Sequence, residues 1–309
     1  MSPKCLTTNR LTIFVAAFLF HCGGIALATT SFMTLTPVSG QLRAECRFVP
    51  ENLQKLGTAP RNEDTNSTCT LDTGSDSTVA PMLQLTSRPD DLLHQMPKNC
   101  MKVQMASFSS NQAEFNLSTA LACKPFRSEG LIGMDAIGHG RVVFDFPRNK
   151  VNFDSNESND TLNFVFDTGT DNRIFLSGKI GGQIIRILWD TGGGLKSEQH
   201  RISGKALELS GVIDKQILQK SPRSFLPLMN LVISNADGSK KSLKLVRCIE
   251  DLEIGPIKTK NLIFAVDDLE KGLFGEFVAP GTNMILGYPA MSNYQWIFDF
   301  NEKTWSASK

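Results

Sequence analysis

The sequence feature that most constrains this chain is a short motif that occurs twice and is followed each time by a second short motif. Leu71-Asp72-Thr73-Gly74-Ser75 reads as the apolar end of a strand, then a carboxylate, then a tight turn, and Trp189-Asp190-Thr191-Gly192-Gly193 repeats this order. One Asp-Thr-Gly alone is weakly diagnostic, because small polar residues also form ordinary hairpin turns. Each copy is followed by an apolar pair that ends in glycine, Leu131-Ile132-Gly133 and Ile285-Leu286-Gly287. The recurrence predicts two related halves.

A longer internal repeat supports this prediction. Residues 131–146 align without a gap on residues 285–300, an offset of 154, with Phe144-Asp145-Phe146 on Phe298-Asp299-Phe300. A repeat of this length indicates two copies of one unit rather than a solenoid of many small units. The second copy has 97 residues from its Asp to its Gly, against 61 in the first. We expect the extra residues to enlarge loops, where insertions are tolerated.

With these motifs the chain resembles the aspartic proteases, both the two-lobed pepsins and the single-lobe retropepsins, in which each lobe gives one Asp-Thr-Gly backed by an apolar-apolar-Gly triplet. The resemblance implies an all-β fold of two related pepsin-like or retropepsin-like β-barrel lobes, with an active-site cleft between them. It implies Asp72 and Asp190 as the catalytic residues. The implied supporting residues are Thr73, Gly74, Ser75, Thr191, Gly192, Gly133 and Gly287.

The supporting residues have distinct expected roles. Thr73 and Thr191 carry hydroxyls that the family uses to bond across the pair of turns, and Ser75 matches the pepsin-like hydroxyl that supports the Asp. Gly193 stands at the equivalent place and offers no hydroxyl, whereas retropepsins have Ala there. Gly74 and Gly192 suit tight turns that can need positive φ. The resemblance is weak for residues 29–68 and 81–120.

Two adjacent carboxylates suit peptide hydrolysis. Two such groups cannot both ionise cheaply, so one keeps a proton. The ionised group takes a proton from a bound water while the protonated group donates to the substrate carbonyl oxygen. The pair titrates as a unit, so the acid and base roles are not assigned separately to Asp72 and Asp190.

A third Asp-Thr-Gly, Asp167-Thr168-Gly169, mimics the motif because Phe164-Val165-Phe166 precedes it. In the family a strand and a glycine-turned hairpin lead into the catalytic turn. Residues 164–166 and 174–189, with Gly181-Gly182 as the turn, supply those elements for Asp190. Asp167 is therefore expected in the first connecting turn of the second lobe. Asp145 and Asp299 each end a strand before a turn, so we interpret them as structural caps.

The N-terminus predicts export. Lys4 and Arg10 precede the apolar run Leu11–Ala28, which ends in the small-x-small site Ala26-Leu27-Ala28, as in a secretory signal peptide. The alternative, an uncleaved membrane anchor, is disfavoured because the run is short for a full span. We predict a signal peptide at 1–28, lobes at 29–155 and 156–309 joined at the polar stretch 154–161, and a secreted or periplasmic location.

Cleavage leaves five cysteines, and export makes disulfides possible. Cys46, Cys69, Cys100 and Cys123 lie in the first half and allow up to two bridges there, whereas Cys248 is expected to be a buried free thiol. The connectivity stays open at this point.

Other chemistries have less support. The four histidines show no metal-ligand spacing, so neither a metal nor an organic cofactor is expected. The net charge of +1 suggests no nucleic-acid partner. The expected partner is a peptide or protein substrate, with no stable membrane span after cleavage. Flap hairpins are expected around Asn235–Gly238 and somewhere in 95–115, without an identifiable flap Tyr.

The predicted function is therefore that of an exported aspartic endopeptidase. One alternative is a non-catalytic peptide-binding relative of the same fold, which Gly193 and the missing flap Tyr favour. A second alternative pairs two chains, each giving the same Asp, although a two-lobed monomer is preferred.

Overall fold

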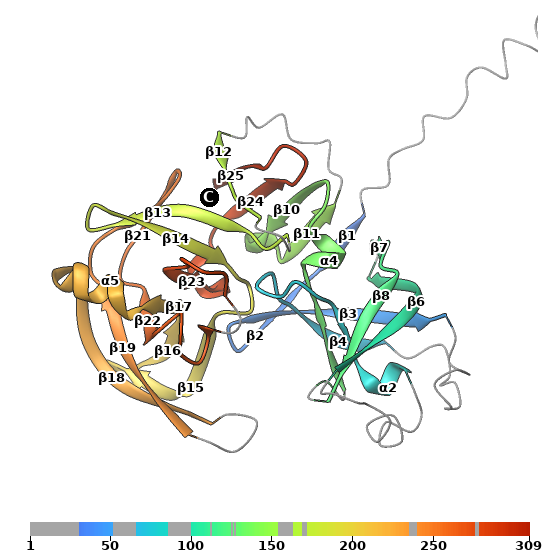
Figure 1. Cartoon of the computed structure of the whole chain (residues 1–309), viewed down its shortest axis with the longest axis horizontal. Coiled ribbons are helices and arrows are strands. Elements are labelled where there is room, and N and C mark those ends of the chain that lie inside the picture. Colours follow the sequence, from blue (N-terminus) through green and yellow to red (C-terminus); the bar gives the residue numbers. More distant parts are fainter. Residues whose placement is uncertain are drawn as a thin grey trace, which may run out of the picture. The chain divides into compact units, whose positions relative to one another are not determined.

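The computed structural model describes residues 31–51, 66–85, 100–111, 113–124, 126, 128–153, 163–168, 172–234, 240–275 and 278–309. The elements below all belong to one unit, Ser31–Lys309 (Figure 1). The predicted signal peptide and the predicted boundary between residues 155 and 156 lie outside the described residues, so both stay predictions.

The first half of the chain forms an eight-stranded sheet with the order β2-β3-β4-β9-β5-β8-β6-β7. Its strands are β2 (Thr36–Val38), β3 (Gln41–Pro50), β4 (Ser67–Leu71), β5 (Val79–Ala80), β6 (Cys100–Ser110), β7 (Ala113–Phe115), β8 (Thr119–Cys123) and β9 (Glu129–Ile132). Two short helices accompany it, α2 (Met82–Leu85) and α4 (Met134–Ile137). Strand β3 buries Leu42, Ala44, Cys46 and Phe48, the period-two pattern of a half-buried strand.

The second half forms a nine-stranded sheet with the order β18-β19-β22-β17-β23-β14-β13-β20-β21. Its strands are β13 (Phe175–Ile180), β14 (Gln183–Trp189), β17 (Gly211–Asp214), β18 (Phe225–Ser234), β19 (Lys240–Cys248), β20 (Leu252–Ile254), β21 (Ile257–Thr259), β22 (Ile263–Asp267) and β23 (Met284–Leu286). Gly181 and Gly182 turn β13 into β14 with φ of 57° and 78°, as a two-residue hairpin requires.

Other elements of the second half are two helices and a hairpin that has no counterpart in the described first half. The helices are α5 (Lys215–Lys220) and α6 (Tyr288–Met291), and the hairpin is β15 (Leu195–Ile202) with β16 (Lys205–Leu209). This hairpin lies between Asp190 and β17, and the connection from β22 to β23 spans residues 268–283. The sequence analysis expected the extra residues of the second half to enlarge loops. Part of them instead form the β15–β16 hairpin, and part lengthen the connection from β22 to β23.

The two halves repeat one topology. In the first, β4 runs parallel to β9, β9 antiparallel to β5, and β5 parallel to β8. In the second, β14, β23, β17 and β22 pair in the same sequence and the same directions. The prediction of an all-β fold built from two related lobes is confirmed.

A third, six-stranded sheet takes three strands from each half, in the order β1-β11-β10-β24-β25-β12 (Figure 1). They are β1 (Phe32–Thr34), β10 (Arg141–Asp145), β11 (Lys150–Phe153), β12 (Phe164–Val165), β24 (Gln295–Asp299) and β25 (Thr304–Ser308). At its centre Val143 of β10 faces Ile297 of β24, and 297 − 143 = 154 is the offset of the sequence repeat. Reciprocal pairing of equivalent residues is what an approximate twofold axis through this pair produces.

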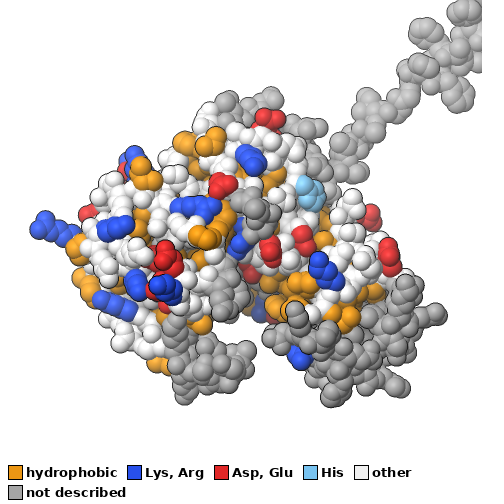
Figure 2. Space-filling model, viewed as in Figure 1, with side chains coloured by type: hydrophobic (Ala, Val, Ile, Leu, Met, Phe, Trp, Pro, Cys, Tyr) orange, Lys and Arg blue, Asp and Glu red, His pale blue; other side chains and the backbone are white. Residues whose placement is uncertain are grey.

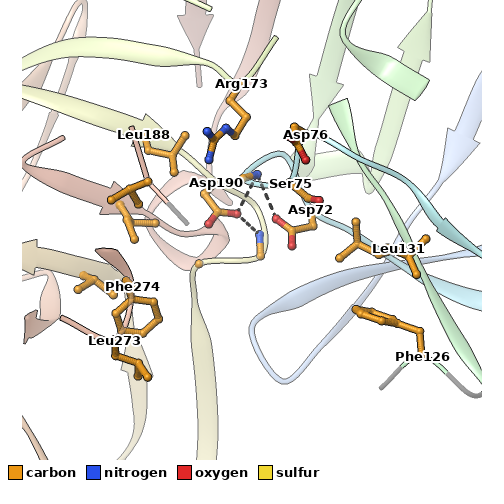
Figure 3. A pocket seen from close by; sticks show the side chains of 17 residues that line it. Asp72, Ser75, Asp76, Phe126, Leu131, Arg173, Leu188, Asp190, Leu273 and Phe274 are labelled. Carbon is orange, nitrogen blue, oxygen red and sulfur yellow. Dashed lines mark hydrogen bonds between the residues drawn. The ribbon is translucent and has the colours of Figure 1, made fainter. Parts of the chain in front are cut away.

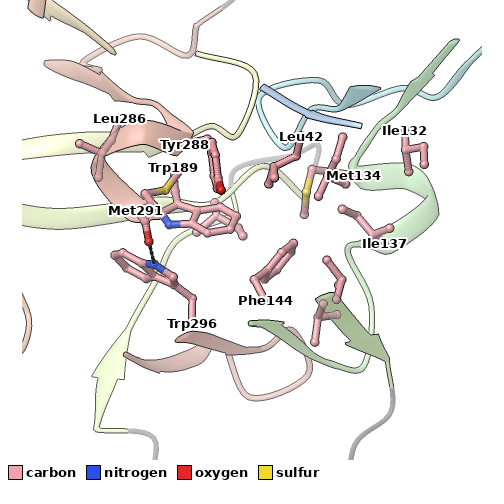
Figure 4. Close-up of a cluster of buried hydrophobic side chains, with 14 of the residues drawn as sticks. Leu42, Ile132, Met134, Ile137, Phe144, Trp189, Leu286, Tyr288, Met291 and Trp296 are labelled. Carbon is pink, nitrogen blue, oxygen red and sulfur yellow. Dashed lines mark hydrogen bonds between the residues drawn. The ribbon is translucent and has the colours of Figure 1, made fainter. Parts of the chain in front are cut away.

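An aromatic cluster joins the shared sheet to the second Asp-Thr-Gly. Trp189, fully buried, has its ring centroid 4.8 Å from that of Phe144, 4.9 Å from that of Phe298 and 5.7 Å from that of Trp296. Figure 4 shows Trp189 with Phe144 and Trp296. Such aromatic pairs contribute about 0.5–1.5 kcal/mol each beyond the area that they bury. Because Trp189 directly precedes Asp190, the cluster fixes the strand end that carries this carboxylate.

Two disulfides lie in the first half, as the sequence allowed. Cys46 bonds to Cys69 and Cys100 to Cys123, so β3 is tied to β4 and β6 to β8. Cys248 is the buried free cysteine that we predicted, and burial raises the pKa of its thiol to about 11. A thiol with so high a pKa is largely protonated near neutral pH and therefore weakly reactive.

Candidate active site

Each Asp-Thr-Gly turn follows a strand, β4 for Asp72 and β14 for Asp190. That strand runs parallel to the strand that leads into the glycine triplet of the same half, β9 or β23. The amide of Asp72 donates to the carbonyl of Ile132 at 3.0 Å, and the amide of Asp190 donates to that of Leu286 at 2.9 Å. The apolar strand ends Leu71 and Trp189 are fully buried, so each turn begins at a fixed point in the core. The two turns are thus held in equivalent ways.

The two threonines bond across the pair of turns, as the resemblance implied. The hydroxyl of Thr73 accepts from the amide of Thr191 at 3.0 Å and donates to the carbonyl of Trp189 at 3.0 Å. The hydroxyl of Thr191 accepts from the amide of Thr73 at 3.2 Å and donates to the carbonyl of Leu71 at 2.7 Å. Both side chains are fully buried, so these four bonds fix the register of the two halves in a low-dielectric environment.

The turns bring the carboxyl groups of Asp72 and Asp190 together (Figure 3). One amide, that of Gly74, donates to Oδ1 of Asp72 at 3.0 Å and to Oδ1 of Asp190 at 3.2 Å. The amide of Gly192 donates to the same oxygen of Asp190 at 2.8 Å. Two oxygens that share one donor must lie close to each other, so the two carboxyl groups lie side by side.

The reason for the glycines in the turns differs from the one predicted. Neither Gly74 nor Gly192 has a positive φ. Instead, a Cβ on Gly74 would overlap the carboxyl group of Asp190, and a Cβ on Gly192 would lie 2.7 Å from Cγ of Asp72. Each turn needs glycine because the carboxylate of the other half approaches its backbone closely.

The carboxyl pair retains a proton more readily than ordinary aspartates do. Burial raises the pKa of Asp72, and burial together with the nearby charge of Asp72 raises the pKa of Asp190 well above its ordinary range. The guanidinium of Arg173, at the edge of the cleft, acts weakly in the opposite direction on Asp72. Raised pKa values in two adjacent carboxyl groups favour a pair that keeps one proton between them.

Gly133 and Gly287 lie directly behind the turns. A Cβ on Gly133 would come within 2.5 Å of the backbone of Ser77, and one on Gly287 within 2.5 Å of the backbone of Gly194. The amide of Gly133 donates to the hydroxyl of Thr78 at 3.1 Å, and the amide of Gly287 donates to the carbonyl of Ser210 at 2.7 Å. These positions therefore permit no side chain.

We expect Gly133→Val and Gly287→Val each to lower the free energy of unfolding by about 1–3 kcal/mol, because the new side chain would force apart a packed backbone crossing. Thermal unfolding followed by circular dichroism measures the loss, and each kcal/mol corresponds to about 2–4 °C for a chain of this size. Gln199→Val, at an exposed position of β15, is the matched control and should leave the midpoint nearly unchanged. Unchanged unfolding of both glycine variants would contradict the close approach.

Ser75 supports Asp72 through its backbone rather than its hydroxyl. Its amide bonds to Asp72, and its hydroxyl donates to the carbonyl of Ser77 at 2.9 Å. Gly193 is its equivalent, because the amide of Gly193 donates to the carbonyl of Asp190 at 3.1 Å and that of Ser75 to the carbonyl of Asp72 at 3.2 Å. A Cβ on Gly193 would lie 2.7 Å from the side chain of Ile285, which explains why no hydroxyl stands there.

The carboxyl pair faces a cleft of about 530 Å³. Apolar side chains line both sides of it: Val79, Phe126 and Leu131 from the first half, and Leu188, Val212, Leu273, Phe274, Val278 and Ile285 from the second. Figure 3 shows Phe126 and Leu131 on one side of the carboxyl pair and Leu273 and Phe274 on the other. A mostly apolar cleft around a few convergent polar groups is typical of a ligand site.

The third Asp-Thr-Gly does not take part. Asp167 lies on the surface, where its carboxylate forms an ion pair with Arg186 at 2.8 Å and its backbone pairs with Phe175. Asp145 and Asp299 cap turns, as predicted, since they accept from the amides of Arg148 and Asn301 at 3.2 and 3.0 Å. The structure therefore agrees with the positional reasoning that set these carboxylates aside.

Several cleft residues were not predicted from the sequence, namely Phe126, Arg173, Leu273 and Phe274. Phe126 lies in the connection from β8 to β9 and Phe274 in the longer connection from β22 to β23, so the two occupy corresponding parts of the repeat. Extending the alignment of the two sequence repeats into these connections would have identified Phe126 and Phe274 as corresponding residues. The hairpin expected around Asn235–Gly238 is present as β18 and β19, although its tip lies outside the described residues.

The remaining expectations concern metals, membranes and nucleic acids. Among the described residues, no three His, Cys, Asp or Glu side chains are grouped to hold a metal ion. In the same part of the chain, no helix is long and apolar enough to cross a membrane. On the face drawn in Figure 2, basic and acidic side chains are interspersed.

Comparisons with known proteins add a likeness of fold. No protein-family model matches the sequence. No curated protein matches it either. Among solved structures, the chain is similar to one described as an aspartic proteinase from Irpex lacteus, with 9% identity, a TM-score of 0.47, and coverage of 91% of this chain and 97% of that chain. At this identity and this TM-score the likeness carries no argument about the activity or the site residues.

Proposed function

We propose that this chain is an exported aspartic endopeptidase that hydrolyses peptide bonds with a water activated by Asp72 and Asp190. The observation that carries the proposal is the sharing of the Gly74 amide between Oδ1 of Asp72 and Oδ1 of Asp190, at 3.0 and 3.2 Å. The reciprocal bonds of Thr73 and Thr191 support it, because they hold the two carboxyl groups in place before any substrate arrives.

In this mechanism the ionised member of the pair accepts a proton from the bound water, and the water oxygen attacks the carbonyl carbon of the scissile peptide bond. The protonated member donates to the carbonyl oxygen as the tetrahedral intermediate forms. The C–N bond then breaks as the carboxyl group that took the water proton donates it to the leaving nitrogen. A hydroxyl proton of the intermediate returns to the other carboxylate, which restores the pair with one proton. The pair shares these roles because its two carboxyl groups titrate together. The reaction requires neither a metal nor an organic cofactor.

Export and a monomeric state belong to the same proposal. The two disulfides support an oxidising compartment, in line with the predicted signal peptide. A single chain supplies both carboxyl groups, which supports a two-lobed monomer over two chains that each give the same Asp. We propose the lobes as residues 29–155 and 156–309.

The alternative is a non-catalytic peptide-binding relative, which the lack of an identifiable flap Tyr in the sequence favours. The test is cleavage of an unfolded protein by purified residues 29–309 from acidic to neutral pH. We expect cleavage that persists with metal chelators and serine-directed reagents. Peptide binding without cleavage under every condition would favour the alternative, and cleavage abolished by chelators would contradict the mechanism.

A further inference from the structure

One wall of the cleft is carried by a connection that is longer in the second half of the chain than in the first. The connection from β8 to β9 covers only residues 124–128, whereas the connection from β22 to β23 covers 268–283 and brings Leu273 and Phe274 to the cleft. A long connection gains specificity only if its backbone is fixed, because ordering each residue otherwise costs about 1–2 kcal/mol. The contacts that fix this loop are therefore of functional interest.

Two buried carboxylates accept hydrogen bonds from backbone amides of this loop, at Leu269 and at Phe274. Asp214 and Asp267 end the neighbouring parallel strands β17 and β22 in register, and they are 3% and 8% exposed. Asp214 accepts from the amide of Leu269 at 2.8 Å, and Leu269 anchors the loop in the core. Asp267 accepts from the amide of Phe274 at 3.1 Å.

The Asp267 contact is built closely. A Cβ on Gly272 would overlap the carboxylate of Asp267, so the loop wraps around that group and tolerates no side chain there. A carboxylate that accepts from a backbone amide forms a stronger hydrogen bond than a neutral acceptor would. The carboxylate of Asp267 therefore holds the backbone amide of Phe274, the residue whose side chain lines the cleft.

We propose that Asp267 is a positioning residue that sets the substrate preference on one side of the scissile bond, by holding Phe274 so that the cleft selects a large apolar side chain there. The part of the proposal that concerns cleavage preference rests on the proposed endopeptidase function. Phe126, on the opposite side of the carboxyl pair, forms the corresponding wall of the first half (Figure 3). The two sides of the scissile bond should therefore respond to different substitutions.

The test uses two pairs of peptides in which Phe is exchanged for Ala on one side or the other of the scissile bond. For the wild-type chain we expect kcat/KM to favour Phe on both sides. Asp267→Ala and Phe274→Ala should each lower the preference for Phe about tenfold on one and the same side, the size expected for lost apolar contacts. Phe126→Ala should lower it on the other side. Asp267→Asn keeps an acceptor for the Phe274 amide and should restore most of the preference.

Controls separate positioning from general stability. Asp299→Ala removes a capping carboxylate at the end of β24 that does not line the cleft, and it should leave both preferences unchanged. If Asp267→Ala does not fold, Gly272→Ala disturbs the same contact while keeping the carboxylate, and should give the same one-sided loss. A folded Asp267→Ala chain with both preferences intact, or with both lowered equally, would overturn the proposal.

The failure of this inference is distinguishable from failure of the proposed function. If the wild-type chain does not cleave, affinity for the same four peptides is measured by fluorescence anisotropy. A binding preference for Phe that Asp267→Ala removes on one side would support the positioning role while the endopeptidase proposal fails. Cleavage without a side-specific effect would overturn the inference alone, and absence of both cleavage and binding would overturn both.

Discussion

Asp72→Asn and Asp190→Asn are each expected to lower kcat for peptide hydrolysis by about 10⁴-fold or more, the size typical of removing one member of a catalytic unit. Asn keeps the shape of the side chain and an oxygen that accepts from the Gly74 amide, so the turn stays in place. It cannot supply the second ionisable group, so the pair can no longer hold one proton between two carboxyl groups. The double variant should be about as inactive as either single one, because the pair acts as a unit.

Asp167→Asn is the matched control. It changes the same motif at a surface position where the carboxylate pairs with Arg186, and it should retain activity. Circular dichroism and thermal unfolding of all variants establish that the fold persists. Activity that survives in both Asp72→Asn and Asp190→Asn would locate the chemistry elsewhere, and loss of activity in Asp167→Asn would contradict the choice between the three motifs.

The parts of the fold that were predictable depend on short, duplicated patterns. Gly133 and Gly287 are identifiable because backbone crossings exclude any side chain, so physics permits one residue type at each position. The 154-residue offset of the repeat reappears where Val143 pairs with Ile297, although the sequence did not predict the sheet that the two halves share. Asp167 was set aside because the strands expected before a catalytic turn lie between Asp167 and Asp190. The structure has these strands, β13 and β14, at that place.

The parts that were missed depend on contacts between distant segments. Strand β15 is mostly exposed and polar, so it lacks the alternation that marks a half-buried strand. Phe126 and Phe274 are ordinary apolar residues in loops until the tertiary structure brings them to one cleft. The role of Gly74 was misread because a tight turn suggests positive φ, whereas the true constraint is the carboxylate of Asp190, 116 residues away.

Peptide hydrolysis by this chain is expected to fall about tenfold for each pH unit above the pKa at which the carboxyl pair loses its shared proton. Burial raises the pKa of both groups, and the charge of Asp72 raises that of Asp190 further, so this alkaline limb should lie above the ordinary value of 3.8 for Asp. A second limb is expected at acidic pH, where both groups are protonated and neither accepts a proton from water. Initial rates with one peptide, measured from about pH 2 to about pH 9 so that both limbs are covered, give the profile. A rate that keeps rising into the alkaline range would contradict the shared proton.

The same raised pKa values predict how stability changes with pH. The folded chain binds protons at Asp72 and Asp190 more tightly than the unfolded chain does, so the contribution of these groups to stability is fully present below their unfolded pKa and is lost as pH rises through the folded pKa. Asp190→Asn removes a group that is costly to ionise, and it should therefore raise the unfolding temperature near neutral pH. That gain should shrink toward pH 3, roughly where the unfolded carboxyl groups also become protonated. Asp167→Asn, at the surface, should show no such gain. If the unfolding temperature of Asp190→Asn rises equally at all pH values, or falls near neutral pH, then ionising the carboxyl pair does not cost stability. Either result would remove the reason to expect a proton shared between the two groups.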